Sequence, residues 1–324
     1  MRILVLGAAG MVGRRLIERL LAEKSIAGET ITAIDAFDVV EPEIAAPEGV
    51  AIDAQAGDIA DEATVRALVE KRPEMIFHLA AIVSGEAEAD FDKGYRINLE
   101  GMSYLLEAIR AAGENYRPRL VFTSSIAVFG APFEDKITDT FLAAPLTSYG
   151  TQKAICELLL NDYSRKGFVD GVGIRLPTIV VRPGKPNKAA SSFFSGIIRE
   201  PLAGEEAILP VADDVRHWVA SPASAVEFLI HAATMDTDVL GARRCLTMPG
   251  LSVTIAEMIE ALREVAGDEV ANRIRREPDA VIEKIVAGWP RDFDASRATS
   301  VGFSADRSFA DIIRAHMADE AGRG

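Results

Sequence analysis

The chain has 324 residues, of which 49% are hydrophobic and 26% are charged, a composition typical of a globular protein with a large core. Its formal net charge of −14 argues against a nucleic-acid partner, because an acidic surface repels polyanions. No apolar stretch approaches the roughly 20 residues that span a bilayer, so no membrane partner is expected. Two cysteines far apart and four scattered histidines predict neither a disulfide framework nor a metal site, and reduced thiols predict a cytoplasmic protein.

Apolar runs alternate with amphipathic helical stretches through residues 2–176. Strands are predicted at residues 2–6, 30–35, 75–79, 119–123 and 171–176. Helices are predicted at residues 11–23, 60–71, 91–112 and 149–166. Strands that alternate with helices predict a parallel sheet covered by helices on both faces, and continuous apolar runs are typical of strands buried on both faces.

The composition changes after residue 176. A Pro/Gly-rich basic stretch comes first, at residues 182–188, and helices are predicted at residues 223–234, 255–266 and 278–287. The expected fold class is α/β, a Rossmann-type doubly wound parallel sheet with a smaller, interleaved C-terminal lobe. The sheet domain is expected at residues 1–176, with returning segments near 212–248, and the lobe at residues 177–211 and 249–324.

A glycine-rich turn, GAAGMVG at residues 7–13, separates the first predicted strand from the first helix. In such a turn the first glycine permits the tight bend, the second lets a pyrophosphate approach the backbone, and the third allows close helix–strand packing. The helix N-terminus then offers N–H groups to the phosphates. A small-residue turn without a ligand is the alternative, but its place after the first strand favours dinucleotide binding by Gly7, Gly10, Met11 and Val12.

Two acidic residues are candidates for the adenosine half of the dinucleotide. Asp35 is expected to end the second strand, about 20 residues past the glycine turn, where a carboxylate bonds the ribose hydroxyls. Because a carboxylate there repels a 2′-phosphate, NAD is expected rather than NADP. Asp58, beside Ile59, follows the next short segment and is a candidate for the adenine. A solvated surface aspartate is the alternative at both positions.

Tyr149 and Lys153 lie four residues apart in a predicted helix, so their side chains share one face. A free tyrosine has a pKa of roughly 10, and a neighbouring cation lowers that pKa. The pair therefore indicates a general base that removes a proton from an alcohol as hydride leaves its carbon. Ser125 lies at the carboxyl end of a predicted strand and is expected to orient the substrate oxygen. Chance spacing and strand-end capping are the alternatives when each residue is taken alone.

Together these segments resemble the extended short-chain dehydrogenase/reductase family over essentially the whole chain. The matching pieces are the glycine turn, Asp35, Asp58, the stretch at 78–81, Asn98, Ser125, Tyr149, Lys153 and the stretch at 176–178. The resemblance implies that Tyr149 is the general base, that Lys153 binds the nicotinamide ribose and lowers the tyrosine pKa, and that Ser125 orients the substrate hydroxyl. It also implies cofactor contacts from Leu79, Ala80, Ala81, Asn98, Pro177 and Thr178. A homodimer through the long helices at 91–112 and 149–166 is implied as well.

Many extended members act on nucleotide sugars, and this chain departs from them at two places. Phe129 stands where those enzymes commonly have a tyrosine after the serine. The segment at 215–221 has no acidic residue before its aromatic Trp218 and has Ser221 in place of their final aspartate. A closer resemblance is to the D-erythronate dehydrogenases, NAD-dependent enzymes that oxidise a four-carbon sugar acid at its 2-hydroxyl. Residues 81–87, 176–187 and 216–218 carry that resemblance.

A small anionic substrate needs a cation in its site, and arginine suits bidentate carboxylate binding. Arg182 and Arg216 are the candidates, with Ser84 and Thr178 as neutral hydrogen-bonding partners. A structural ion pair with one of the 49 acidic residues is the alternative for either arginine. The expected function is NAD-dependent oxidation of a small sugar acid to the 2-keto acid. A nucleotide-sugar epimerase or dehydratase that retains NAD, and a catalytically silent NAD-binding protein, are the alternatives.

Overall fold

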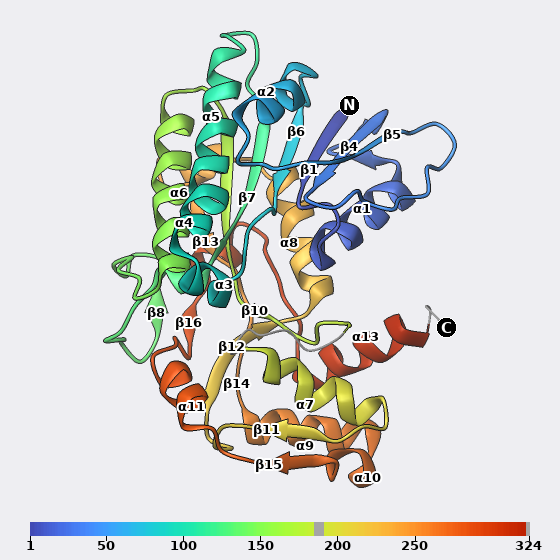
Figure 1. Ribbon diagram of the computed structural model, residues 1–324, viewed down its shortest axis with the longest axis vertical. Helices are drawn as coiled ribbons and strands as arrows, with labels where there is room; N and C mark the ends of the chain where they lie inside the picture. Colours follow the sequence, from blue (N-terminus) through green and yellow to red (C-terminus); the bar gives the residue numbers. More distant parts are fainter. Residues whose placement is uncertain (185–190, 322–324) are drawn as a thin grey trace. The chain divides into compact units, whose positions relative to one another are not determined.

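The computed structural model describes residues 1–184 and 191–321, which divide into two compact units (Figure 1). Unit 1 comprises residues 1–128, 145–175 and 226–246. Unit 2 comprises the described residues within 129–144, 176–225 and 247–324. Within the described residues, none of the helices combines the length and the apolar character that crossing a membrane requires.

Unit 1 is built on a seven-stranded sheet with the order β13-β9-β7-β6-β1-β4-β5. The strands are β1 (Arg2–Leu6), β4 (Ala33–Asp38), β5 (Ala51–Ala56), β6 (Met75–His78), β7 (Arg119–Ser125), β9 (Asp170–Leu176) and β13 (Cys245–Thr247). β1 pairs in parallel with both β4 and β6, and the pairs β4–β5 and β6–β7 are parallel too. The chain starts at β1, runs outward to β5 and resumes at β6 on the other side of β1, so the predicted doubly wound fold is confirmed.

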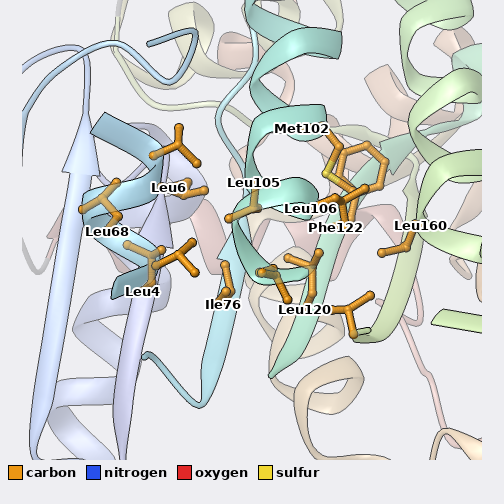
Figure 2. Packing of buried hydrophobic residues seen from close by; sticks show 14 of the residues in the cluster. Leu4, Leu6, Leu68, Ile76, Met102, Leu105, Leu106, Leu120, Phe122 and Leu160 are labelled. Carbon is orange, nitrogen blue, oxygen red and sulfur yellow. The ribbon is translucent and has the colours of Figure 1, made fainter. Parts of the chain in front are cut away.

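Helices cover this sheet because its strands are apolar on both faces. The helical segments of unit 1 are α1 (Met11–Glu23), α2 (Glu62–Glu70), α3 (Ser84–Ala89), α4 (Phe91–Gly94), the π-helical η1 (Tyr95–Glu100), α5 (Gly101–Ala111) and α6 (Ser148–Arg165). On one face, Leu4 and Leu6 of β1 belong to the same buried cluster as residues of α2, α5 and α6, among them Leu105 and Leu160 (Figure 2). Successive strand residues point to opposite faces, which directs Ile3 and Val5 to the other side.

Three elements of unit 1 differ from the sequence prediction. The second strand lies at Ala33–Asp38, three residues later than predicted, because Glu29–Thr30 pairs with Ser25–Ile26 in a small hairpin. Strand β5 was missed, because all of its residues are at least partly exposed and its sequence lacks a continuous apolar run. The single helix predicted at residues 91–112 is divided into α4, η1 and α5.

Unit 2 contains a three-stranded sheet with the order β10-β12-β14 and a layer of helices. Its strands are β10 (Thr178–Ile179), β12 (Arg216–Ala220) and β14 (Leu251–Thr254), with the shorter pairs β11 (Ala207–Leu209)–β15 (Ile274–Arg276) and β8 (Ile137–Thr138)–β16 (Phe293–Asp294). Its helices include α7 (Ser192–Leu202), α9 (Ile255–Ala266), α11 (Ala280–Ala287) and α13 (Phe309–Ala321). Phe194, Val219 and Met258 lie in one buried apolar cluster, so the unit has a core of its own.

The unit boundaries differ from the predicted division in two places. The chain leaves unit 1 after Arg175, next to the predicted boundary, but returns to it at Val226, within α8 (Pro222–Thr234), rather than near residue 212. The later return follows from β12, which pairs with β10 and β14 of unit 2. Residues 129–144 also belong to unit 2, where β8 pairs with β16. The Pro/Gly-rich stretch at 182–188 lies partly outside the described residues.

Candidate active site

The glycine turn follows β1 at the point where the strand order reverses. Gly7 has a φ of +91°, which residues with a side chain rarely adopt. A Cβ there would also lie 2.7 Å from the backbone nitrogen of Ala80, which follows β6. A Cβ on Gly13 would collide with the Gly7 carbonyl oxygen, so this glycine lets α1 approach the turn. The two glycines therefore let the turn pack closely against the end of β6 and the start of α1, at the carboxyl end of the sheet, where doubly wound folds bind ligands.

The N-terminus of α1 is open to an anion. Gly10 is the N-cap residue, so no side chain caps the helix, and no acidic residue lies in the first turn. Met11 and Val12 are only half-buried, and the first N–H groups of a helix have no partner within it. These N–H groups and the positive end of the helix dipole suit a pyrophosphate.

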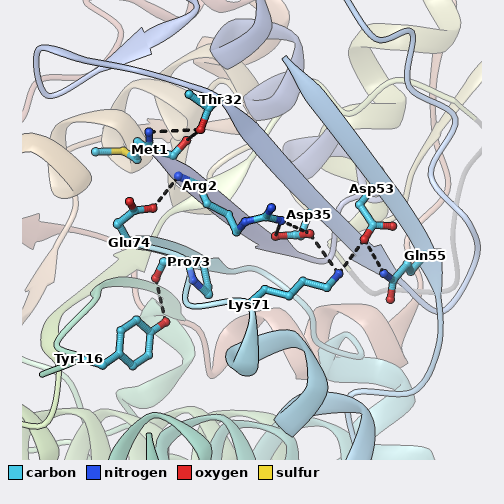
Figure 3. Close-up of polar contacts among 10 residues, drawn as sticks. All are labelled: Met1, Arg2, Thr32, Asp35, Asp53, Gln55, Lys71, Pro73, Glu74 and Tyr116. Atoms are coloured by element: carbon cyan, nitrogen blue, oxygen red, sulfur yellow. Dashed lines mark hydrogen bonds and ion pairs between the residues drawn. The ribbon is translucent and has the colours of Figure 1, made fainter. Parts of the chain in front are cut away.

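Asp35 does not end its strand, which corrects the prediction. β4 continues to Asp38, and Asp35 lies opposite Leu4 in the middle of the β1–β4 pair. Its side chain is 2% exposed and binds Arg2 at 3.0 Å and Lys71 at 3.1 Å (Figure 3). The Asp35 carboxylate is therefore occupied by two cations of the chain and does not lie at the strand end beside the glycine turn.

Asp38 occupies the position that was predicted for Asp35. It is the last residue of β4, and its Oδ2 accepts a hydrogen bond from the Ala9 N–H at 2.8 Å. The N–H groups of Gly7 and Ala8 donate to the Phe37 carbonyl at 2.9 and 3.1 Å, which holds the end of β4 against the glycine turn. The sequence contained this residue, but the misplaced strand start put the strand end three residues too early.

Asp58 and Ile59 follow β5. Asp58 forms an ion pair with Arg96 at 2.5 Å, and the hydrogen bond from that guanidinium is the main reason why the pKa of the carboxyl is lowered. Its other oxygen accepts from the Ala60 N–H at 2.9 Å. Ile59 is buried, and a Cβ on Gly101 would lie 3.1 Å from it. The contact of Asp58 with the adenine stays a prediction, and Arg96 is a neighbour that the sequence analysis did not name.

Asn98 fixes the stretch that leaves β6. That stretch, Leu79 to Ala81, begins with a hydrogen bond of 2.8 Å from the Leu79 N–H to the Leu6 carbonyl. The buried amide of Asn98, in η1, accepts from the Ile82 N–H at 2.9 Å and donates to the Ile82 carbonyl at 3.2 Å. Asn98 therefore shapes the loop next to the glycine turn through its backbone. Two residues further on, Ser84 begins α3 and is exposed.

Ser125, Tyr149 and Lys153 come together in unit 1. Ser125 ends β7, and the other two lie one turn apart on α6. The Lys153 ammonium lies 5.7 Å from the centre of the Tyr149 ring and donates to the Thr123 carbonyl at 2.8 Å. The Ser125 hydroxyl hydrogen-bonds the Tyr149 phenol, and its oxygen also accepts from the Ala127 N–H at 3.1 Å. The three predicted catalytic residues are thus neighbours in the structure.

Two residues next to Tyr149 set the start of α6. The Thr147 hydroxyl caps the helix by accepting from the Gly150 N–H at 3.1 Å. A Cβ on Gly150 would collide with the Ala127 carbonyl oxygen just beyond β7. The glycine therefore allows the close approach that places Tyr149 beside Ser125, a role that the sequence analysis did not assign.

Burial controls the protonation of the pair on α6. It raises the pKa of the Tyr149 phenol to about 12, and the hydrogen bond from Ser125 opposes that change. It lowers the pKa of the Lys153 ammonium to about 8. The net pKa of the phenol in the chain alone therefore lies above its ordinary value, because desolvation of the phenolate outweighs the hydrogen bond from Ser125, and the lowering by Lys153 stays a prediction.

A buried ion pair near Lys153 was missed by the sequence analysis. Glu157 of α6 binds Arg175 of β9 at 2.9 and 2.8 Å and accepts a hydrogen bond of 2.5 Å from the Ser124 hydroxyl. The negative charge of Glu157 raises the pKa of Lys153, against the larger lowering by burial. Its position four residues after Lys153, on the same helix face, was the available signal.

Thr178 of unit 2 has an unforeseen partner. Its Oγ1 lies 2.6 Å from Nε2 of His217, a buried residue of β12. The imidazole stacks on Phe194 with a centroid distance of 4.9 Å and contacts Trp289 at 5.3 Å. Pro177, which precedes Thr178, is buried. A polar residue next to the apolar residues 218–220 of β12 was the sequence signal for His217.

The two predicted arginines have different surroundings. Arg182 donates to the carbonyl and the hydroxyl of Ser191 at 3.1 and 3.2 Å, and among the described residues no carboxylate pairs with it. Burial, and then the neighbouring Arg199, lower the pKa of Arg182. Arg216 lies 3.5 Å from the carboxylate of Glu257. The structural ion pair that was the alternative for both residues is therefore found at Arg216.

Comparisons with known proteins give the family. The model of the NAD dependent epimerase/dehydratase family matches residues 3–239. The chain belongs to this family. The predicted membership and the prediction of NAD as cofactor are thereby confirmed. The glycine turn, the open end of α1 and the strand-end Asp38 fit a dinucleotide of that kind.

Relatives within the family differ in their described activities. A D-erythronate dehydrogenase of Cupriavidus necator is 47% identical over 323 residues, which cover 98% of each chain. A D-erythronate dehydrogenase of Haemophilus influenzae is 41% identical over 97% of this chain and 98% of its own. The solved structure of a nucleoside-diphosphate-sugar epimerase from Agrobacterium tumefaciens is 58% identical, with a TM-score of 0.97 over 99% of this chain and 95% of its own.

Among the described residues, no cluster of three or more His, Cys, Asp or Glu could hold a metal ion.

Proposed function

We propose that this family member is an NAD-dependent dehydrogenase that oxidises the 2-hydroxyl of a small sugar acid, of the D-erythronate type, to the 2-keto acid. The observation that carries the proposal is the similarity, over nearly the whole chain, to two D-erythronate dehydrogenases. The neighbouring side chains of Ser125, Tyr149 and Lys153 support it, because they supply what alcohol oxidation requires.

We assign the cofactor to the turn between β1 and α1. The pyrophosphate would lie at the N-terminus of α1, where Gly10 leaves the backbone open. Asp38, rather than Asp35, would accept hydrogen bonds from the adenosine ribose hydroxyls, because its carboxylate lies at the strand end against the turn. Lys153 would bind the nicotinamide ribose. When bound, NAD would supply the acceptor for the hydride from C2 of the substrate.

Tyr149 acts as the general base in this proposal. Oxidation of an alcohol to a ketone releases a hydride and a proton, and the phenolate of Tyr149 takes the proton from the 2-hydroxyl. Ser125, which hydrogen-bonds the same phenol, orients the substrate oxygen. Because the pKa of the phenol is about 12 in the chain alone, the active fraction grows as the pH rises or as a positive charge is bound beside it.

We propose Arg182 as the residue that binds the substrate carboxylate. It is a partly buried cation without a carboxylate partner among the described residues, so an anionic ligand would supply the missing counter-charge. Arg216 is the weaker candidate, because Glu257 already lies beside it. Thr178 is proposed as a neutral substrate ligand. Ser84, exposed at the start of α3, is kept as a second one.

The experiment measures NADH directly. Purified protein with NAD and D-erythronate should show growing near-ultraviolet absorbance of NADH, and Tyr149→Phe should abolish it. Tyr104→Phe, on α5, is the matched control and should retain activity. Silence of the wild type across a panel of four- to six-carbon sugar acids would end the proposal.

An epimerase or dehydratase that retains its NAD is the second candidate. The 58% identity to the nucleoside-diphosphate-sugar epimerase structure favours it. That activity predicts no net NADH, a protein that purifies with tightly held cofactor, and conversion of a nucleotide sugar. The same purified sample therefore separates the two candidates.

We further propose a homodimer through α5 and α6, as the family resemblance implies. Leu158 on α6 is 69% exposed, and a contact between such helices would cover a large apolar side chain of this kind. Sedimentation should give a dimer for the wild type and a monomer for Leu158→Glu. A monomeric wild type would contradict the proposal.

A further inference from the structure

Gln152 is a buried polar residue of α6 that the proposed function leaves unused. Its side chain is fully buried one position before Lys153, and its Oε1 accepts a hydrogen bond of 2.8 Å from Nδ2 of Asn98. A buried amide is costly unless it is hydrogen-bonded. Nε2 of Gln152 makes no hydrogen bond among the described residues, so the compensation comes through Oε1. This bond joins the helix that carries Tyr149 and Lys153 to η1.

The backbone of Ile82 fixes how the two amides are oriented. Its N–H can only donate, so the atom of Asn98 that faces it at 2.9 Å is Oδ1. The two hydrogens of Nδ2 are then used by the Ile82 carbonyl at 3.2 Å and by Oε1 of Gln152. A reversed Asn98 amide would turn N–H groups toward the Ile82 N–H, and a reversed Gln152 amide would turn them toward Nδ2. The oxygen of Gln152 therefore has to face Asn98.

A second contact from α6 holds the same residue. Cys156 lies one turn after Gln152, and its Sγ donates to the Asn98 carbonyl at 3.2 Å. Gly94, just before η1, makes room for Gln152, because a Cβ on this glycine would lie 2.6 Å from Nε2. Helix α6 therefore binds Asn98 through both its side chain and its backbone, with Gln152 closely packed in place.

Asn98 in turn holds a loop that lies against the glycine turn. Residues 79–83 form neither helix nor strand, and the N–H and the carbonyl of Ile82 are both bonded to the Asn98 amide. Earlier in the same loop, the backbone of Ala80 lies so close to Gly7 that a Cβ on Gly7 would be 2.7 Å from the Ala80 nitrogen. This glycine turn is where we assign the pyrophosphate of NAD, so the loop borders the proposed cofactor site.

We propose that Gln152 is a positioning residue for the cofactor: it holds the Asn98 amide, which keeps the loop at 79–83 against the glycine turn in the form that receives NAD. The inference rests on the cofactor site of the proposed function. Without an acceptor at position 152, one N–H of Asn98 would be buried unpaired, and turning it to another partner would release Ile82. NAD would then bind a loop that has to be ordered again, which lowers the apparent affinity.

Calorimetric titration of the full chain with NAD tests the inference. Gln152→Met keeps the length of the side chain and removes the acceptor, so the Kd for NAD should rise by about 3- to 10-fold, as expected for one hydrogen bond. In turnover, Gln152→Met should raise the KM for NAD more than it lowers kcat. Gln152→Glu keeps an oxygen that accepts from Asn98 and should retain most of the affinity.

Thr151→Val is the matched control on the same helix. It removes the hydrogen bond of 2.9 Å from the Thr151 hydroxyl to the Thr147 carbonyl and leaves the contact with Asn98 intact, so the Kd for NAD should not change. An unchanged Kd in Gln152→Met, or an equal rise in Gln152→Glu or in Thr151→Val, would overturn the inference.

Hydrogen exchange of the Ile82 amide covers the case in which a variant does not fold. In the wild type this N–H should exchange slowly although it lies outside helices and strands, because its acceptor is the buried Asn98. It should exchange faster in Gln152→Met and unchanged in Thr151→Val. Fast exchange in the wild type would refute the inference. Neither binding nor exchange requires turnover, so a wild type that binds NAD but oxidises no sugar acid would overturn the proposed reaction and not this inference.

Discussion

Replacing Glu157 by glutamine should destabilise unit 1 strongly. The Glu157 side chain is 5% exposed and binds Arg175, itself 10% exposed, in addition to the Ser124 hydroxyl. Glutamine has nearly the same size and still offers one amide oxygen, but it carries no charge and turns an N–H group toward the pair. The guanidinium of Arg175 would lose the charge of Glu157 while it stays buried.

The expected magnitude follows from this geometry. Removing one partner of a buried ion pair costs about 3–5 kcal/mol, because the remaining charge stays desolvated. The amide oxygen of glutamine retains part of the hydrogen bonding, so we expect the free energy of unfolding to fall by about 3–4 kcal/mol. The pair Arg165–Asp162 lies on the same helix with side chains 63% and 58% exposed. Asp162→Asn should therefore change the free energy of unfolding by less than about 0.5 kcal/mol.

Urea denaturation followed by circular dichroism measures both variants against the wild type. The chain's two tryptophans, Trp218 and Trp289, lie in unit 2, so their fluorescence reports that unit while circular dichroism reports both. The double variant Glu157→Met/Arg175→Met should recover most of the loss, because neither member of the ion pair is then buried without the other.

A loss below about 1 kcal/mol in Glu157→Gln would refute the reasoning, since it would mean that the charge of Glu157 contributes little to the stability of the buried Arg175. A loss equal to that of Asp162→Asn would have the same meaning. If the double methionine variant were as unstable as Glu157→Gln, packing rather than charge would dominate at this site.

Three further variants test the site residues. Ser125→Ala removes the hydrogen bond that opposes the raised pKa of Tyr149. The rise of kcat/KM with pH should therefore move to higher pH. An unmoved pH profile would contradict an effect of this hydrogen bond on the tyrosine pKa. The pKa of Lys153 is lowered from 10.5 to about 8. Between these pH values the unfolded chain binds more protons than the folded chain, so the free energy of unfolding rises with pH. Lys153→Met should lack this rise between pH 8 and 10 in urea titrations. Gly13→Ala should cost about 1–3 kcal/mol of unfolding free energy, because its methyl meets backbone. Gly288→Ala, with its nearest atom at 3.6 Å, should cost little and serves as the control.

The sequence predicted the elements that local pattern determines. Apolar runs located most strands of the sheet, and the glycine spacing located the turn at its centre. Asp35 shows where local pattern fails: a charged residue after apolar ones looked like a strand end. The two cations that allow it to be buried, Arg2 and Lys71, lie 33 and 36 residues away in the chain. A buried charge of this kind cannot be distinguished from an exposed one without its distant partners.

The same reason explains the outcome for the catalytic pair. Helical spacing correctly predicted that Tyr149 and Lys153 are neighbours, because i and i+4 positions share a face. It could not predict the net rise of the tyrosine pKa in the chain alone, because burial is a property of the packed unit and not of the helix. Desolvation raises one pKa and lowers the other, so both groups are pushed toward their neutral forms. In the proposed function Tyr149 would therefore stay mostly protonated at neutral pH in the chain alone, and a positive charge bound beside the phenol would favour the phenolate.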